Sequence, residues 1–179
     1  GVFKRRGWSA ADGFDMCVFL GDLNYRVEGN RRAVDVLLER GMLDVMLVMQ
    51  GLGSYPIALG GSDELRNEVL PKVATGSRIA AFGLTEPGAG SSLGEVQTTA
   101  KRDGDGWVLD GQKTFITNAG LADFYTVLCR TSGTPGGREG GDGLTMFYVP
   151  AESIGLSVER FEVMAPHPIG EVHFKGVSV

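Results

Sequence analysis

Ala80-Ala-Phe-Gly-Leu-Thr-Glu-Pro-Gly-Ala-Gly-Ser-Ser92 begins the stretch that decides the fold, which continues to Asn118. An apolar run, 79–84, stops abruptly at Thr85-Glu86-Pro87-Gly88. This pattern is typical of a buried strand that enters a loop. Residues 88–92 are only Gly, Ala and Ser, so backbone N–H groups could approach a ligand there, and the hydroxyls of Thr85, Ser91 and Ser92 could donate or accept hydrogen bonds. For such a loop alone, a tight turn without a ligand is the commoner case.

The second part of the stretch is Gly111-Gln-Lys-Thr-Phe-Ile-Thr-Asn118, which follows Trp107-Val-Leu-Asp110. Together these residues predict one long strand, and Asp103-Gly-Asp-Gly106 before it predicts a hairpin turn. Phe115 and Ile116 are expected to offer a flat apolar surface with the Thr117 hydroxyl beside it. Considered alone, this is an ordinary strand.

Together, the two parts resemble the acyl-CoA dehydrogenase family. The resemblance covers about Gln50 to Val179 and includes 70–76 (Leu-Pro-Lys-Val-Ala-Thr-Gly) and 170–174 (Gly-Glu-Val-His-Phe) in the family's order. It implies a flavoprotein that binds FAD on a β-domain. The cofactor-binding residues that it implies are Phe82, Gly83, Leu84, Thr85, Gly90, Ser91, Phe115, Ile116 and Thr117.

The resemblance also implies individual roles. Thr85 would hydrogen-bond the flavin ring, and Ser91 would also touch the thioester end of the acyl-CoA substrate. The segment 115–117 would lie against the flavin, although many members carry Trp where this chain has Phe115. Ser92 stands where the family usually has Asp, which removes a charge beside the loop. Glu86 is expected to be structural and not to transfer a proton.

The reaction that the resemblance implies is α,β-dehydrogenation of an acyl-CoA thioester, with flavin chemistry supplied by the cofactor. The family's partners would be an electron acceptor such as an electron-transferring flavoprotein, and three further copies in a homotetramer. The family's catalytic carboxylate belongs to a C-terminal helical domain, and this sequence stops at Val179. The catalytic residue is therefore unknown, and we expect the 179-residue chain alone not to catalyse dehydrogenation.

The first 48 residues have a different resemblance. Phe19-Leu-Gly-Asp-Leu-Asn-Tyr-Arg26 and the predicted helix 31–40 after it are similar to one motif of the inositol polyphosphate 5-phosphatases. The resemblance would place Asp22 and Asn24 in a catalytic centre, where such a pair can orient a water and hold a phosphate oxygen. The family's other motifs are absent, so an Asp/Asn turn is favoured over a working phosphatase. The chain is therefore interpreted as an apparent chimera, joined near 45–50, with a phosphatase fragment or a non-catalytic chain as the alternatives to a dehydrogenase fragment.

Composition narrows the function classes. The 179-residue chain is 42% hydrophobic and 22% charged with a net charge of −5, which favours an ordinary globular protein and does not suggest a nucleic-acid or membrane-surface partner. Cys17 and Cys129 lack metal-ligand spacing, so no metal site is predicted and a reduced setting, cytoplasmic or mitochondrial matrix, is favoured. No apolar run approaches the roughly 18–20 residues of a membrane span.

The predicted fold class is α+β. Ser62 predicts the N-cap of a helix that ends at Gly76, with Pro71 bending or shortening it, and Pro56 predicts a kink or boundary in an earlier helix. His173 is expected to face solvent, and His167 to be a packing or turn residue. Short segments separated by glycine turns predict an antiparallel barrel or sandwich; they are 79–84, 95–102, 107–117, 124–130, 144–149, 156–160 and 172–174. The predicted domains are a phosphatase-like fragment (1–48), the end of a helical domain (49–76) and a flavin-binding β-domain (77–179).

Overall fold

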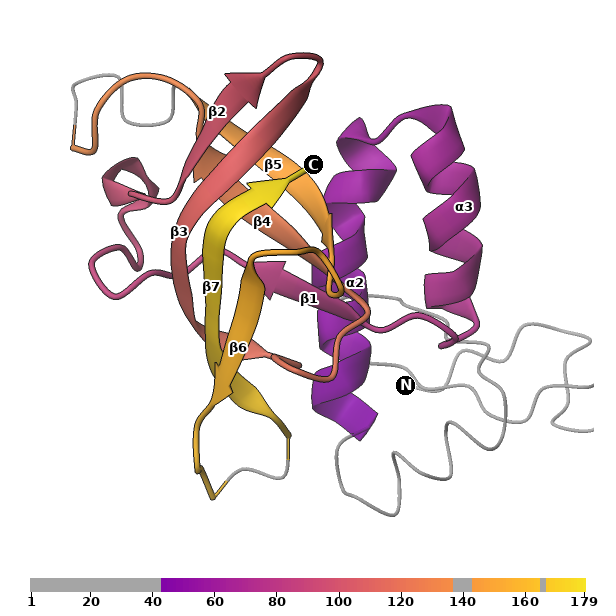
Figure 1. The fold of residues 1–179 in the computed structure, drawn as a ribbon. Helices are drawn as coiled ribbons and strands as arrows, with labels where there is room; N and C mark the ends of the chain where they lie inside the picture. The colour runs from indigo at the N-terminus through magenta and orange to yellow at the C-terminus, as the bar shows by residue number, and fades with distance from the viewer. Residues whose placement is uncertain (1–42, 137–142, 165–166) are drawn as a thin grey trace, which may run out of the picture.

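The computed structural model describes residues 43–136, 143–164 and 167–179. Within them, two helices, α2 (Leu43–Gly60) and α3 (Asp63–Ala74), precede a curled, seven-stranded sheet (Figure 1). The strands are β1 (Ala80–Gly83), β2 (Thr99–Asp103), β3 (Gly106–Thr117), β4 (Phe124–Arg130), β5 (Leu144–Pro150), β6 (Leu156–Arg160) and β7 (Ile169–Ser178). The predicted strand 16–20, the helix 31–40 and the sites at Asp22 and Asn24 lie outside the described residues.

The sheet is mixed, which corrects the prediction of a purely antiparallel barrel. Its strand order is β1-β4-β2-β3-β7-β6, and β5 pairs with β4 off this path. The pairs β2/β3, β3/β7, β6/β7 and β4/β5 are antiparallel, but β1 runs parallel to β4, and β2 meets β4 in parallel at Thr99 and Arg130. The chain between β1 and β4 includes β2 and β3, so no tight turn requires the β1/β4 pair to be antiparallel.

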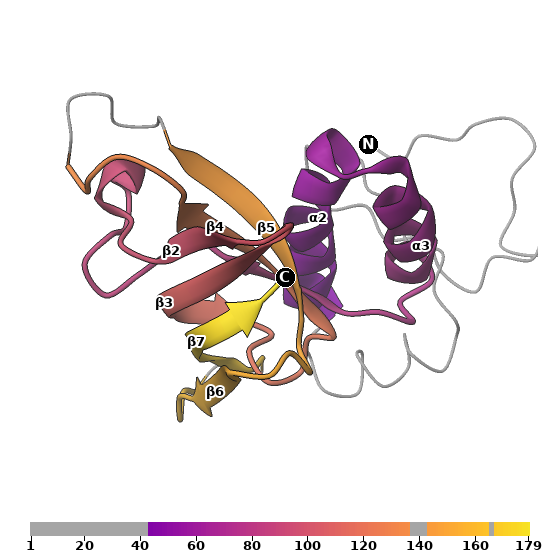
Figure 2. The ribbon, with the colours of Figure 1, turned by 45° about the horizontal axis from the view of Figure 1, so that its top comes forward.

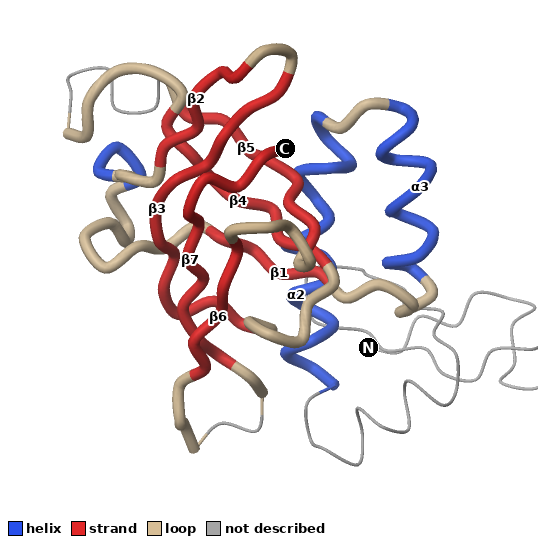
Figure 3. The backbone as a smooth tube through the Cα atoms, viewed as in Figure 1, coloured by secondary structure: helices blue, strands red, loops and turns tan. Residues whose placement is uncertain are grey.

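The helices cover one side of the sheet (Figures 2 and 3). Ser62 caps α3 as predicted, since its hydroxyl accepts a hydrogen bond from Leu65 N at 3.2 Å. Pro56 lies inside α2 and Pro71 inside α3, so neither proline ends its helix. Of the kink or boundary predicted at Pro56, the boundary is absent. Pro71 falls in the last turn of α3, and the helix ends three residues later at Ala74, close to a residue that cannot donate a helical hydrogen bond.

Close packing joins α2 to β1 and β4. A side chain at Gly53 could not fit, because a Cβ there would lie 2.7 Å from the Cβ of Ala80. Gln50 bridges the two elements: its Oε1 accepts from Ala80 N at 2.6 Å, and its Nε2 donates to Arg78 O at 2.8 Å. The Thr126 hydroxyl on β4 donates to Gly53 O at 2.9 Å. The helical pair is thereby fixed to the strand that leads into the loop 84–92.

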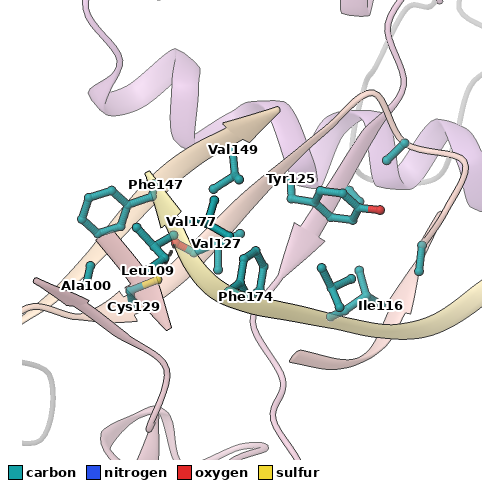
Figure 4. Close-up of a cluster of buried hydrophobic side chains, with 14 residues drawn as sticks. Ala100, Leu109, Ile116, Tyr125, Val127, Cys129, Phe147, Val149, Phe174 and Val177 are labelled. Atoms are coloured by element: carbon teal, nitrogen blue, oxygen red, sulfur yellow. Dashed lines mark hydrogen bonds between the residues drawn. The ribbon is translucent and has the colours of Figure 1, made fainter. Parts of the chain in front are cut away.

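The main core lies inside the curl of the sheet (Figure 4). Its buried side chains come from β1 to β5 and β7, and include Leu109, Val127, Phe147, Val172 and Phe174. Each fully buried aliphatic or aromatic side chain contributes roughly 1.5–3 kcal/mol through removal from water. A second buried cluster packs the helices against the sheet; it consists of Ile57, Val69, Val73, Ala80 and Phe124.

The predicted strand 95–102 starts later than expected. Leu93–Glu95 instead form one turn of 3₁₀ helix, and β2 begins at Thr99. The reason is that the backbone N–H groups of Gln97 and Thr98 donate to the side chain of Glu86 and not to a neighbouring strand. The predicted strand 172–174 is the middle of a longer strand, β7.

Candidate functional site

The loop that follows β1 closes on itself through a short turn. Glu86 N donates to Ala89 O at 2.9 Å and Ala89 N to Glu86 O at 3.2 Å, around Pro87-Gly88. Ala89 is buried, whereas Gly90, Ser91 and Ser92 are exposed. The small residues of the loop therefore form an accessible rim on an anchored base.

Glu86 is that anchor. Its side chain points inward and is only 5% exposed. The carboxylate accepts hydrogen bonds from Gln97 N at 2.7 Å, from Thr98 N at 2.9 Å and from Lys113 Nζ at 2.7 Å. A buried charge is tolerated when its oxygens are paired in this way. The expectation that Glu86 is structural agrees with this geometry.

Lys113 joins the loop to β3. The residue is fully buried, and its ammonium group donates to Leu84 O at 3.1 Å as well as to Glu86. Next to it, Thr114 N donates to Thr85 O at 2.9 Å. Gly111 permits this approach, because its φ is +148° and a Cβ there would lie 2.6 Å from the Thr98 hydroxyl oxygen. At this point the two parts of the deciding stretch therefore meet through three hydrogen bonds, and a fourth joins Asn118 to Ala80 O.

Burial and pairing act in opposite directions on the two charges. Burial raises the pKa of Glu86, but the hydrogen bonds from Lys113, from Thr98 and from the backbone N–H groups of Gln97 and Thr98 together outweigh it and hold the pKa below its ordinary value. Burial lowers the pKa of Lys113, and the Glu86 carboxylate opposes that shift. Because the carboxylate is stabilised in its charged form and already bonded at both oxygens, it is poorly suited to accept a substrate proton.

A bulge in β3 presents Phe115 to solvent. The β3/β7 register shifts between Lys113 and Ile116, and Phe115 has a φ of +56°. The residue is 65% exposed, and its ring packs edge-on to that of Phe161, with ring centroids 5.7 Å apart. A positive φ at a residue with a large side chain costs about 1–2 kcal/mol. The backbone thus adopts an unfavourable conformation that leaves an aromatic ring at the surface.

Ile116 differs from the expectation. The residue is 2% exposed, and its side chain belongs to the main core (Figure 4). The bulge turns Phe115 and Ile116 to opposite sides, so Phe115 alone supplies the expected apolar surface. Thr117 is half-buried at the end of β3.

The other predicted cofactor-binding residues differ in how far they are buried. Gly83 is buried against Val127, while Phe82, Leu84 and Thr85 are half-buried and Gly90 and Ser91 are exposed. Leu84 packs on the small cluster of Ala89, Val96 and Leu128. The structure thus brings the loop and the bulge of β3 together, and it places the side chain of Ile116 and the position of Gly83 away from the accessible surface.

Sequence reasoning missed three residues that hold this arrangement. They are Lys113, Asn118 and Arg130. Asn118 has a φ of +67° and donates from Nδ2 to Ala80 O at 3.0 Å. Arg130 donates to Val96 O at 3.0 Å and to Gly94 O at 2.7 Å, which fixes the far end of the loop. For Lys113 and Arg130 the available signal was a cation in a predicted strand, because a buried charge needs a partner; no comparable signal marked Asn118.

Comparison with known proteins identifies relatives. Residues 81–177 match the family model for the acyl-CoA dehydrogenase, middle domain. Cyclohexane-1-carbonyl-CoA dehydrogenase of Geobacter metallireducens is 44% identical over 118 residues, which is 66% of this chain and 30% of the relative. The chain spans about a third of the length of the curated relatives that it matches.

Solved structures share the fold. A glutaryl-CoA dehydrogenase from Mycobacterium smegmatis in complex with FADH2 matches 79% of this chain and 36% of its own, with a TM-score of 0.69 and 34% identity. A chain in a structure of the electron transferring flavoprotein of Acidaminococcus fermentans matches 82% of this chain and 40% of its own, with a TM-score of 0.70 and 30% identity. Within the described part of the chain, no helix combines the length and apolar character that crossing a membrane requires.

Proposed function

The chain belongs to the acyl-CoA dehydrogenase family, and from this premise we propose that its β-domain, 77–179, binds FAD as part of an enzyme that dehydrogenates an acyl-CoA thioester. Residues 49–76 would be the end of the helical domain that precedes it. The observation that carries the proposal is the Phe115 bulge, which holds an exposed aromatic residue next to Thr114, whose backbone N–H donates to Thr85 O at the start of the small-residue loop.

The residues present fit a flavin. An isoalloxazine ring needs a flat apolar neighbour and hydrogen-bond donors at its rim. Phe115 supplies the first, and the Thr85 hydroxyl together with the exposed Gly90 and Ser91 of the loop offers the second. No side chain crowds the loop at Gly90, where a Cβ would meet nothing within 4 Å. The aromatic face and the polar rim are the two features that the isoalloxazine ring requires.

The residues of the proposed flavin site would contribute by holding the flavin and the substrate in place. Phe115 would pack against the ring and exclude water from one side, and Thr85 would orient it by hydrogen bonding. Ser91 would contact the thioester end of the substrate. When bound, FAD would supply the hydride-accepting chemistry. The Glu86–Lys113 ion pair would keep the loop and the bulge at a fixed distance from each other, which is what positioning contributes to such a reaction.

In this proposal, Glu86 is not the base that removes the α-proton of the substrate. That carboxylate is buried and bonded to Lys113, Gln97 and Thr98. We therefore propose that the carboxylate is supplied by a part of the enzyme other than the described site, and that the 179-residue chain alone does not turn over acyl-CoA. The proposed electron acceptor is an electron-transferring flavoprotein, which the similarity to the Acidaminococcus chain supports.

The test is a titration of the folded 179-residue chain with FAD, followed by the visible absorbance and fluorescence of the flavin. We expect a perturbed, saturable flavin band. Removal of the aromatic face in Phe115→Ala should weaken binding about three- to tenfold, and loss of one hydrogen bond in Thr85→Ala about fivefold.

The matched control is Ile154→Ala, which truncates an apolar side chain that is 94% exposed and lies in the turn before β6. It should bind FAD as the parent does. Far-UV circular dichroism confirms the fold of each variant. Absence of saturable binding by the folded parent, or equal affinity in the parent and both site variants, would contradict the proposal.

A further inference from the structure

Three metal-ligating side chains gather on the outer face of β6 and β7. They are Glu159, Glu171 and His173, and each offers one ligand atom within 4.8 Å of the others. Glu159 lies directly opposite Glu171 in the antiparallel pairing, and His173 lies two residues further along β7 on the same face. Sequence spacing predicted no metal site, because the ligands come from two strands that the sequence does not show to be neighbours.

The placement is electrostatically unfavourable without a cation. Like charges that face each other across antiparallel strands repel and destabilise the pair. Glu171 and His173 are partly sheltered, with 23% and 28% of their side chains exposed, so solvent screens them only in part. A divalent cation between the two carboxylates would convert this repulsion into attraction on both sides.

Glu171 is also held in position from a third strand. Gln112 Nε2 on β3 donates to its Oε2 at 2.6 Å, and the Thr114 hydroxyl donates to its Oε1 at 3.1 Å. Each carboxylate oxygen has a second lone pair, so both can still bind a metal. Hydrogen bonds of this kind orient a ligating carboxylate in known metal sites. His173 Nε2 lies 3.6 Å from Glu171 Oε2, on the side where the ion would sit.

We propose that Glu159, Glu171 and His173 bind one Zn²⁺ ion, with water completing the coordination. One imidazole nitrogen and two carboxylate oxygens favour zinc over calcium or magnesium, which take oxygen ligands. The ion ties β6, at the edge of the sheet, to β7. Through Glu171 and Thr114 it also steadies the strand segment that precedes Phe115. This site is separate from the proposed flavin site and does not depend on it.

The experiment is a Zn²⁺ titration of the chelator-treated 179-residue chain, in competition with a chromophoric chelator. We expect one ion per folded chain. Glu159→Gln and His173→Asn should each weaken binding at least tenfold, and Gln112→Ala, which removes an orienting hydrogen bond, about tenfold. Zn²⁺ should raise the thermal midpoint of the parent and leave that of Glu159→Gln unchanged.

Matched controls are His167→Asn, which removes the chain's other histidine, and Glu152→Gln, which removes an exposed carboxylate outside the cluster. Both should bind as the parent does. Glu159 is exposed, so its variant is expected to fold, and circular dichroism without metal verifies this. The absorption spectrum of the Co²⁺ form separates imidazole and carboxylate ligation from thiolate ligation. The proposal is overturned by a thiolate charge-transfer band, by unchanged affinity in Glu159→Gln and His173→Asn, or by no saturable binding in the folded parent.

Discussion

The buried ion pair between Glu86 and Lys113 makes the strongest prediction. In Lys113→Met the chain keeps the volume of the side chain but loses the ammonium group, which is fully buried. Glu86 would retain the hydrogen bonds from Gln97 N and Thr98 N at 2.7 and 2.9 Å. Its charge would stay in the interior without a cation, and Leu84 O would lose the donor that now lies 3.1 Å away.

The expected loss is large for a single substitution. Removing one partner of a buried ion pair costs about 3–5 kcal/mol of unfolding free energy. For a chain of this size, 1 kcal/mol corresponds to roughly 2–4 °C in the thermal midpoint, so the midpoint should fall by roughly 6–20 °C. The double variant Glu86→Gln/Lys113→Met should be less destabilised than the sum of its single variants by about 1–3 kcal/mol, because the unpaired charge is gone.

The assay is urea unfolding followed by far-UV circular dichroism. Lys72→Met is the matched control, since its ammonium lies at the surface 3.6 Å from Glu68 and 45% of the side chain is exposed. An exposed pair of this kind contributes about 0–1 kcal/mol. If Lys113→Met costs no more than Lys72→Met, the reasoning about the pair is refuted.

The pH dependence of stability is a second test of the Glu86–Lys113 pair. The folded-state pKa of Glu86 is held below its ordinary value of 4.5. A carboxyl with a depressed pKa contributes stability above its unfolded-state pKa and loses it as the pH falls through the folded-state value. The parent should therefore lose stability as the pH drops below about 4.5. The double variant Glu86→Gln/Lys113→Met should lose less over the same range, and parallel curves would contradict the assignment.

Two further predictions concern buried polar groups. Burial raises the pKa of the Cys129 thiol to about 12. In a Cys17→Ser chain, iodoacetamide should therefore label Cys129 only after the chain is unfolded in urea, as measured by mass spectrometry. Rapid labelling of the native chain would contradict this prediction. Asn118→Ala should cost about 2–3 kcal/mol, because Ala fits a φ of +67° poorly and the bond to Ala80 O is lost. Asn118→Gly should lose less unfolding free energy in the same urea assay, because glycine tolerates that φ. The surface control Asn67→Ala should change stability by less than about 0.5 kcal/mol. Equal losses of stability in the two Asn118 variants would argue against backbone strain.

Local signals predicted the elements whose causes are local. Ser62 predicted the start of α3, and the predicted strand 124–130 has the bounds of β4. The segment 156–160 likewise matches β6. In these cases the residues that determine the element lie within or next to it. The same holds for the hairpin between β2 and β3, which the Gly-Asp turn predicted.

Prediction failed where a distant side chain decided the outcome. Gln97 and Thr98 look like strand residues, but their N–H groups are taken by Glu86, which lies eleven and twelve residues away. The parallel pairing of β1 with β4 joins segments forty-four residues apart in the chain, Ala80 with Phe124. A period of two cannot show which of two neighbours, Phe115 or Ile116, faces the core once a bulge shifts the register.

The failures at Gln97 and Thr98 and at Phe115 and Ile116 lie together in the molecule, where the loop after β1 meets the bulge of β3. A buried lysine, a phenylalanine at positive φ and an asparagine at positive φ all occur between Lys113 and Asn118. Each is unusual in or next to a strand, and the positive φ of Phe115 costs roughly 1–2 kcal/mol, whereas asparagine tolerates that conformation better. Such a concentration persists only where surrounding contacts enforce it, and functional sites are where it is found. The Glu86–Lys113 pair supplies that enforcement, because it fixes β3 to the loop on one side of the bulge while Asn118 fixes it to β1 on the other. The exposed ring of Phe115 is therefore the product of buried contacts on both sides, which is why a substitution at Lys113 should affect flavin binding without touching the surface that binds it.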